Sequence, residues 1–229
     1  MKLAFDRLGS GPPIILVLGA FNTRETGAPL AAALAEHFTV INYDRRGRGG
    51  SEDEPTYTVE REVDDLHFLL DQVGGHANVF GFSSGAALAL TAARTLAIDH
   101  LILFDLPLRL PPFNQPDHAA ILAGLSRGDA VEYFQREMVG IPAPVVEQLR
   151  TAPFRPALEA MAHTLVYEAK ILGDGMIHDL PTCPTLALCG ASSPPFMRAT
   201  TEAFANHQIL DTGHDLQPAV LVPPIRSFC

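Results

Sequence analysis

Short apolar runs alternate with stretches of helical periodicity along the first hundred residues of the chain. Residues 14–18 read IILVL without a polar interruption, which is typical of a strand buried on both faces of a parallel sheet. Residues 58–73 instead place apolar side chains at helical spacing. The same patterns predict further strands at 3–8, 38–43, 77–82 and 100–104, and further helices at 28–37 and 84–97. Strands that alternate with helices predict an α/β fold, with a mostly parallel sheet and helices on both faces.

The pattern changes between residues 106 and 182, where prolines are frequent and no strand pattern stands out. Four stretches there have amphipathic helical spacing: 117–127, 128–139, 144–150 and 156–172. The β/α pattern resumes with a strand at 185–189, a helix at 195–206, a strand at 207–211 and a terminal helix at 217–228. A separate helical domain is the alternative, but a position between β-like segments favours an insertion. We expect a core of residues 1–105 and 183–229 that carries a helical cap of residues 106–182.

Composition and charge limit the classes of molecule that the protein is expected to bind. The chain has 229 residues and a formal net charge of −10, and its one basic cluster, at 45–48, is followed at once by acidic residues. Nucleic acid is therefore a poor partner. Cys183, Cys189 and Cys229 fit neither a disulfide framework nor a zinc-ligand pattern, so we expect no metal. The apolar run at 14–18 is too short to span a bilayer, and we expect a cytoplasmic protein that does not bind membranes.

The most informative segment for chemistry is 81–85, which reads GFSSG. It fits G-x-S-x-G, a pattern that places a serine on a sharp turn between a strand and a helix. Small flanking residues allow the strained turn, and the turn lifts the hydroxyl of Ser83 above the edge of the sheet. The predicted strand before it and helix after it are the arrangement that this motif requires. An ordinary strand–loop–helix turn is the alternative reading.

With this motif between a predicted strand and helix, the chain resembles the α/β-hydrolase superfamily. The resemblance covers nearly the whole chain. A second matching segment is 44–51, DRRGRGGS, which is similar to the family's D-x-R-G-x-G-x-S turn and is taken as structural. The resemblance implies a cofactor-free serine hydrolase. The chain lacks G-x-x-x-x-G-K-[ST], and its glycines at 47–50 do not match G-x-G-x-x-G, so a nucleotide-binding α/β protein is set aside.

The resemblance also implies partners for Ser83. The family places its general base after the last strand, where this chain has His214. It usually supplies the acid on the loop at 188–194, but that loop holds no carboxylate, and Ser193 stands about where Asp is expected. A known variation moves the acid to the end of the preceding strand, which here gives Asp105. The alternative, that Asp105 only caps a loop, has equal weight.

The oxyanion hole of such an enzyme needs two backbone N–H groups. The resemblance implies one from Ser84, directly after the nucleophile. The other is expected from the loop after the strand at 14–18, with Ala20 as first choice and Phe21 as second. The helical cap is expected to cover Ser83, and its large apolar residues are candidates for pocket walls, although internal packing is favoured for each: Phe113, Tyr133, Phe134, Met138, Phe154, Met161 and Tyr167.

We therefore expect a carboxylic ester hydrolase that cleaves a small ester, lactone or thioester through an acyl-enzyme on Ser83. The expected partners are a small ester-like molecule and at most a second copy of the chain in a homodimer. A cofactor-free perhydrolase or a C–C bond hydrolase would share Ser83 and His214. A non-catalytic binding protein that has kept the scaffold is the third hypothesis, motivated by the missing acid at Ser193.

Overall fold

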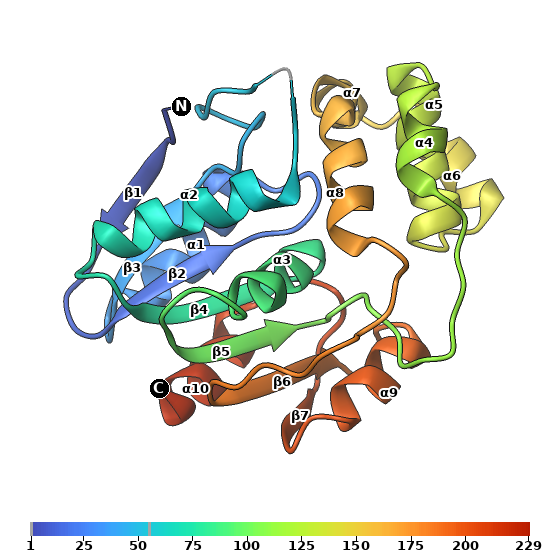
Figure 1. The fold of residues 1–229 in the computed structure, drawn as a ribbon. Coiled ribbons are helices and arrows are strands. Elements are labelled where there is room, and N and C mark those ends of the chain that lie inside the picture. The colour runs from blue at the N-terminus through green and yellow to red at the C-terminus, as the bar shows by residue number, and fades with distance from the viewer. Residues whose placement is uncertain (1, 55) are drawn as a thin grey trace.

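The computed structural model describes residues 2–54 and 56–229 and contains a seven-stranded sheet. The strands follow the order β1-β3-β2-β4-β5-β6-β7, and every neighbouring pair is parallel except β1 and β3. Their bounds are β1 Phe5–Leu8, β2 Pro13–Val17, β3 Thr39–Tyr43, β4 Ala77–Phe82, β5 Ile98–Phe104, β6 Thr185–Gly190 and β7 Asn206–Leu210. The predicted mostly parallel α/β fold is confirmed, with β1 as its antiparallel edge (Figure 1).

Helices cover both faces of this sheet because alternate side chains of each buried strand point to opposite faces. On one face, Ile14 and Leu16 pack with α1 (Arg24–Leu34) and α10 (Pro218–Phe228). On the other face, Ile15 and Val17 pack with α2 (Val59–Asp71) and α3 (Ser84–Ala92). Helix α9 (Pro195–Glu202) packs on β6 and β7. The uninterrupted apolar run at 14–18 is thus explained by burial on two sides.

The chain between β5 and β6 is helical and lies beyond the carboxyl ends of the central strands (Figure 1). Its elements are α4 His118–Ala123, α5 Arg127–Tyr133, the π-helix η1 Phe134–Met138, α6 Ala143–Leu149, α7 Arg155–Ala160, the 3-10 helix η2 Ala162–Thr164 and α8 Leu165–Leu172. We call residues 118–172 the helical insertion. It has an apolar cluster of its own, which includes Leu122, Val131 and Leu165. The expected helix at 156–172 is divided by η2 into α7 and α8.

Three helices of the core differ by several residues from the predicted bounds, and one of them, expected at 195–206, ends at Glu202 as α9. The helix expected at 28–37 begins at Arg24, where the hydroxyl of Thr26 accepts a hydrogen bond from the N–H of Thr23 and caps the first turn. The helix expected at 84–97 ends at Ala92, and two tight turns complete the path to β5. None of the helices described has both the length and the apolar character needed to cross a membrane.

Candidate active site

Ser83 sits at a sharp turn between the end of β4 and the start of α3. Its backbone has φ 56° and ψ −130°, a region that costs a non-glycine residue on the order of 1–3 kcal/mol. The glycines on either side make this turn sterically possible. A Cβ on Gly81 would lie 2.5 Å from Ala86 Cα, and one on Gly85 would lie 2.1 Å from the carbonyl oxygen of Val17. The segment therefore has the geometry that G-x-S-x-G predicts.

Backbone strain is concentrated at the candidate site. Within the described residues, three non-glycine residues have positive φ: Phe21 at 60°, Ser83 at 56° and Asp105 at 51°. Each follows the carboxyl end of a central strand: Phe21 follows β2, Ser83 follows β4 and Asp105 follows β5. All three were singled out from the sequence, for the oxyanion loop, the nucleophile and the acid. Strain of this kind persists where the surrounding structure enforces it, commonly at active sites.

Asp105 and His214 are directly hydrogen-bonded. Nδ1 of His214 lies 2.8 Å from Oδ2 of Asp105, although the two residues are 109 positions apart in the chain. The Asp105 side chain is fully buried, and its Oδ1 accepts a bond of 3.0 Å from the N–H of Gly190. An Nδ1–H that donates to this carboxylate leaves Nε2 of His214 as the basic nitrogen.

Ser193 contributes to the same cluster. Its hydroxyl donates a 2.8 Å hydrogen bond to Oδ2 of Asp105, so this oxygen accepts from both Ser193 and His214. The neighbouring thiol of Cys189 is buried, and its burial together with the Asp105 carboxylate raises the pKa of Cys189 to about 12. Asp211 and Asp215, the acids nearest to His214 in sequence, are not bonded to its ring; Asp215 instead accepts from Thr212 and Gln217.

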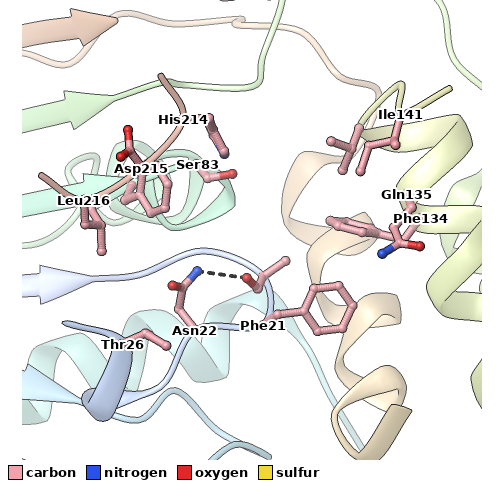
Figure 2. Close-up of a pocket in the computed structure, with 13 residues that line it drawn as sticks. Phe21, Asn22, Thr26, Ser83, Phe134, Gln135, Ile141, His214, Asp215 and Leu216 are labelled. Atoms are coloured by element: carbon pink, nitrogen blue, oxygen red, sulfur yellow. Dashed lines mark hydrogen bonds between the residues drawn. The ribbon is translucent and has the colours of Figure 1, made fainter. Parts of the chain in front are cut away.

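Ser83 and His214 line the same pocket, which has a volume of about 530 Å³. In Figure 2 the Ser83 hydroxyl and the His214 ring lie near each other on the core side of that pocket. The ring of Phe82 packs against His214, with 4.7 Å between ring centroids. No hydrogen bond joins Ser83 to His214 in the described part of the chain. Nucleophile–base contacts are often long before substrate binds, and both groups here face one cavity.

The two expected oxyanion donors have different surroundings. Ser84 is the first residue of α3, so its N–H has no acceptor within the helix. The N–H of Ala20, the first choice from sequence, donates to the hydroxyl of Ser84 at 3.1 Å and is therefore already engaged. The N–H of Phe21 makes no hydrogen bond within residues 2–54 and 56–229. The structure thus favours Phe21 over Ala20 as a donor, because the N–H of Ala20 is engaged and that of Phe21 is free among the residues described. The local sequence pattern could not reveal the bond from Ala20 to Ser84.

The comparison with known families agrees with this geometry. The model of the alpha/beta hydrolase family matches residues 14–223. The chain belongs to this family. It is similar to a crystal structure of an alpha/beta hydrolase from Sphaerobacter thermophilus, with 44% identity over 99% of this chain and 95% of that one and a TM-score of 0.89. A thermophilic esterase from Thermogutta terrifontis is 26% identical, with coverages of 98% and 88% and a TM-score of 0.62.

A curated relative matches over a shorter segment. The hydrolase YraK of Bacillus subtilis is 42% identical over 86 residues, which are 36% of this chain and 32% of that protein. The chain thus matches about a third of the length of that relative. Its activity, like that of the other relatives, is not established for this chain by the match.

The pocket of this alpha/beta hydrolase has walls from both the core and the helical insertion. The core residues that line it include Phe82, Asn22 and Leu216, and the insertion supplies Phe134, Gln135, Val139 and Ile141. Figure 2 shows Asn22 and Leu216 on the side of Ser83, and Phe134, Gln135 and Ile141 across the cavity from them. Of the seven cap residues that were candidates for pocket walls, only Phe134 lines this pocket.

The other candidates serve elsewhere in the fold. Phe113, Tyr133 and Met138 line a separate cavity of about 230 Å³. Phe154 is exposed, and the ring of Tyr167 stacks on that of Tyr57 with 3.9 Å between centroids. Tyr133 and Met138 also pack against the apolar cluster of the helical insertion, as the preference for internal packing expected for these two.

Gln135 and Asn22 are pocket residues that sequence reasoning missed. Gln135 belongs to the π-helix η1, a geometry that is frequent at functional sites, and it is buried although its Oε1 has no hydrogen-bond partner in the described chain. Asn22 belongs to the loop after β2, and its amide donates to the carbonyl of Ala20 at 2.9 Å (Figure 2). The sequence offers no signal that singles out Gln135, because it is one of five polar residues in the amphipathic stretch 128–139.

A metal site is not evident among the residues described, since no group of three or more His, Cys, Asp or Glu side chains is placed to hold an ion. The lining of the pocket contains no lysine or arginine and one carboxylate, Asp215. Hydrogen bonds from Gln217 and Thr212 lower the pKa of Asp215, so this side chain is ionised at neutral pH. The pocket is therefore mainly apolar, with amide groups and one negative charge at its edge.

Proposed function

We propose that this alpha/beta hydrolase is a serine hydrolase that cleaves a small carboxylic ester, lactone or thioester through an acyl-enzyme on Ser83. The observation that carries the proposal is the 2.8 Å bond from His214 Nδ1 to the buried Asp105 carboxylate, on a histidine that shares a pocket with Ser83. A fixed tautomer and a buried acid are what a histidine needs in order to act as a general base for serine.

In the proposed reaction, Nε2 of His214 takes the proton of Ser83 Oγ as that oxygen attacks the carbonyl carbon of the substrate. The resulting imidazolium is stabilised by Asp105. Collapse of the tetrahedral intermediate breaks the bond to the leaving group, which receives the proton from His214. Water then attacks the acyl-enzyme with His214 again as base, and the carboxylic acid is released while Ser83 regains its proton.

The negative charge that develops on the substrate oxygen requires donors that are already in place. We assign this role to the N–H groups of Ser84 and Phe21. Ser84 lies at the positive end of the α3 dipole, which favours negative charge nearby. Removing one such donor typically costs about 10²–10³ in kcat, so each assignment has a measurable consequence.

The pocket supports a compact substrate. A cavity of about 530 Å³ lined largely by apolar side chains suits a small acyl or alcohol group more than a long chain. Without a lysine or arginine in its lining, the pocket offers no permanently charged cation to pair with a carboxylate or phosphate on the substrate. The similarity to an esterase, at 26% identity, agrees with ester cleavage.

A panel of p-nitrophenyl esters and small lactones tests the proposal, with wild-type protein and the Ser83→Ala variant measured side by side. We expect turnover of short-chain esters by the wild type and a loss of at least about 10³-fold in the variant. Equal turnover by the two proteins would refute the role of Ser83. Turnover of none of these substrates, together with no reaction of Ser83 with a phosphonate, would favour the binding-protein alternative.

A further inference from the structure

A buried cluster of two arginines and two glutamates lies directly against the loop that carries Phe21. Arg45, Arg48, Glu62 and Glu168 are each at most 2% exposed. Arg45 makes a two-point contact with Glu62, at 2.6 and 2.7 Å, and also bonds Glu168 at 3.2 Å. Arg48 bonds Glu168 as well. Two positive and two negative side chains balance, so the buried cluster carries no net charge.

Both arginines also donate to carbonyl groups of this loop. Nη1 of Arg45 bonds the carbonyl oxygen of Leu18 at 3.2 Å, and Nη1 of Arg48 bonds that of Gly19 at 2.8 Å. The next carbonyl, that of Ala20, accepts from the side chain of Asn22 at 2.9 Å (Figure 2). Three consecutive carbonyl groups thus accept hydrogen bonds from side chains, and the Gly19 carbonyl also accepts a longer bond of 3.3 Å from the backbone N–H of Asn22.

These contacts determine where the N–H groups of the loop point. In a planar trans peptide, the C=O and the N–H point in opposite directions. Arg48 fixes the Gly19 carbonyl, and the N–H on the far side of that peptide, from Ala20, bonds Ser84. Asn22 fixes the Ala20 carbonyl, and the N–H on the far side of that peptide belongs to Phe21, which lines the pocket. The arginines and Asn22 therefore hold the free Phe21 N–H in one orientation.

The residues of this cluster come from distant parts of the chain, so the cluster does more than stabilise the turn at 44–51. In the turn at 44–51, Arg45 and Arg48 occupy two of the three variable positions of the motif, whereas Arg46 is the motif arginine. Glu168 comes from α8 of the helical insertion, 120 residues beyond Arg48, and α8 packs on α2 and α3 (Figure 1). Buried ion pairs add little stability in general, because burial of the charges offsets their attraction. The presence of these ion pairs at this loop is better explained by their effect on the orientation of its peptide groups.

We propose that Arg48 and Glu168, together with Arg45, are positioning residues that hold the oxyanion loop so that the Phe21 N–H faces the reacting carbonyl. This inference rests on the proposed serine hydrolase mechanism. Loss of the Arg48 contact leaves the Gly19 carbonyl with only the 3.3 Å bond from the N–H of Asn22, so the peptides that follow are held less firmly. The developing charge on the substrate oxygen then meets a misaligned donor, whereas ground-state binding in the apolar pocket is little changed. The effect falls on kcat more than on KM.

The test compares Arg48→Met and Arg48→Lys with a matched control, Arg46→Met. Arg46 is a buried arginine of the same turn, but it bonds Asp65 and the carbonyl of Arg61 instead of the loop. For each variant, kcat and KM on a p-nitrophenyl ester, inhibition by a trifluoromethyl ketone and the thermal unfolding midpoint are measured. The ketone forms a tetrahedral adduct on Ser83 and reports on the oxyanion hole separately from substrate binding.

We expect Arg48→Met to lower kcat about 10- to 100-fold and to weaken the ketone by a similar factor, with KM within about threefold. Arg48→Lys keeps the charge beside Glu168 and should recover part of the loss. Arg46→Met should lower the unfolding midpoint but keep kcat within about threefold. If Arg48→Met does not fold, Arg48→Lys decides, with an expected loss in kcat of at least about threefold.

Two results would overturn the inference. One is a folded Arg48 variant with the kcat and ketone affinity of the wild type. The other is an equal loss of kcat in Arg46→Met, which would indicate a general effect of disturbing the turn. Failure of the proposed function is distinguishable, because the wild type itself would then turn over no ester and bind no ketone.

Discussion

The hydroxyl of Ser193 donates a 2.8 Å hydrogen bond to Oδ2 of Asp105, the same oxygen that faces Nδ1 of His214. Ser193 follows β6, at the place where a resemblance to the hydrolase family predicts the acid, whereas Asp105 follows β5. The two ends are adjacent because β5 and β6 pair in parallel. An acid from one strand is thus anchored by a hydroxyl from the next, and the missing carboxylate at position 193 does not leave His214 without a partner.

The variant Asp105→Asn should lower kcat on a good ester by about 10³–10⁴-fold. An amide at this position can donate to Nδ1, which moves the ring proton of His214 to Nε2, the nitrogen that must accept the proton of Ser83. The matched control is Asp211→Asn, an exposed acid of the His214 loop that does not contact the ring. Comparable losses from both substitutions would contradict the assignment of Asp105.

Ser193→Ala should have a smaller effect than Asp105→Asn. The carboxylate of Asp105 keeps its bonds to Gly190 and His214 but loses one of its donors, and Oδ2 remains buried. We expect kcat to fall about 3- to 10-fold and the free energy of unfolding to fall by about 1–2 kcal/mol. Steady-state kinetics and urea denaturation measure the two effects. Unchanged values of both would show that the hydroxyl is dispensable.

Alkaline pH should destabilise the fold in part through Cys189. Burial and the Asp105 carboxylate raise the pKa of this thiol to about 12, so as pH rises the unfolded chain loses this proton first. The stabilising contribution is complete below the ordinary thiol pKa near ~8.5 and is lost between that value and about 12. Above pH ~9, the free energy of unfolding of wild type should fall more steeply than that of Cys189→Ala, by up to ~1.4 kcal/mol per pH unit. Parallel curves would contradict this.

Neutral esters should be better substrates than anionic ones of the same size. Asp215 is the one charged residue among those that line the pocket, and hydrogen bonds keep it ionised. We expect kcat/KM for a p-nitrophenyl butyrate to exceed that for a succinate monoester, and Asp215→Asn to raise the latter about two- to fivefold, a modest change because Asp215 is exposed and screened. A preference for the anionic ester in wild type would contradict this account of the pocket.

The parts of this protein that sequence predicted are those encoded by local patterns. The apolar run at 14–18 indicated the central strand, and GFSSG indicated the strained turn at Ser83. Asp105 and His214 were implied by the resemblance to the α/β-hydrolase superfamily, which places an acid and a base after strands. The two lie side by side because the carboxyl ends of parallel strands meet at one edge of the sheet. Helix bounds were less accurate, since Thr23 caps α1 ahead of a glycine and a proline that oppose helix formation.

The remaining features depend on contacts between distant segments. The engagement of Ala20 by Ser84, which favours Phe21 as the donor, joins residues 64 positions apart. The arginines at 45 and 48 were included in a structural turn, and their contact with Glu168 spans more than a hundred residues. The residues of the helical insertion that line the pocket could not be identified from sequence either. On short helices, apolar residues that pack in a core and those that line a cavity have the same spacing.

Reaction with a fluorophosphonate, followed by intact mass measurement and peptide mapping, tests the central claim most directly. The account predicts one adduct per chain, on the peptide that contains Ser83, with none in Ser83→Ala and strongly slowed formation in His214→Ala. An adduct on a different residue, or equal labelling rates in the wild type and His214→Ala, would contradict it.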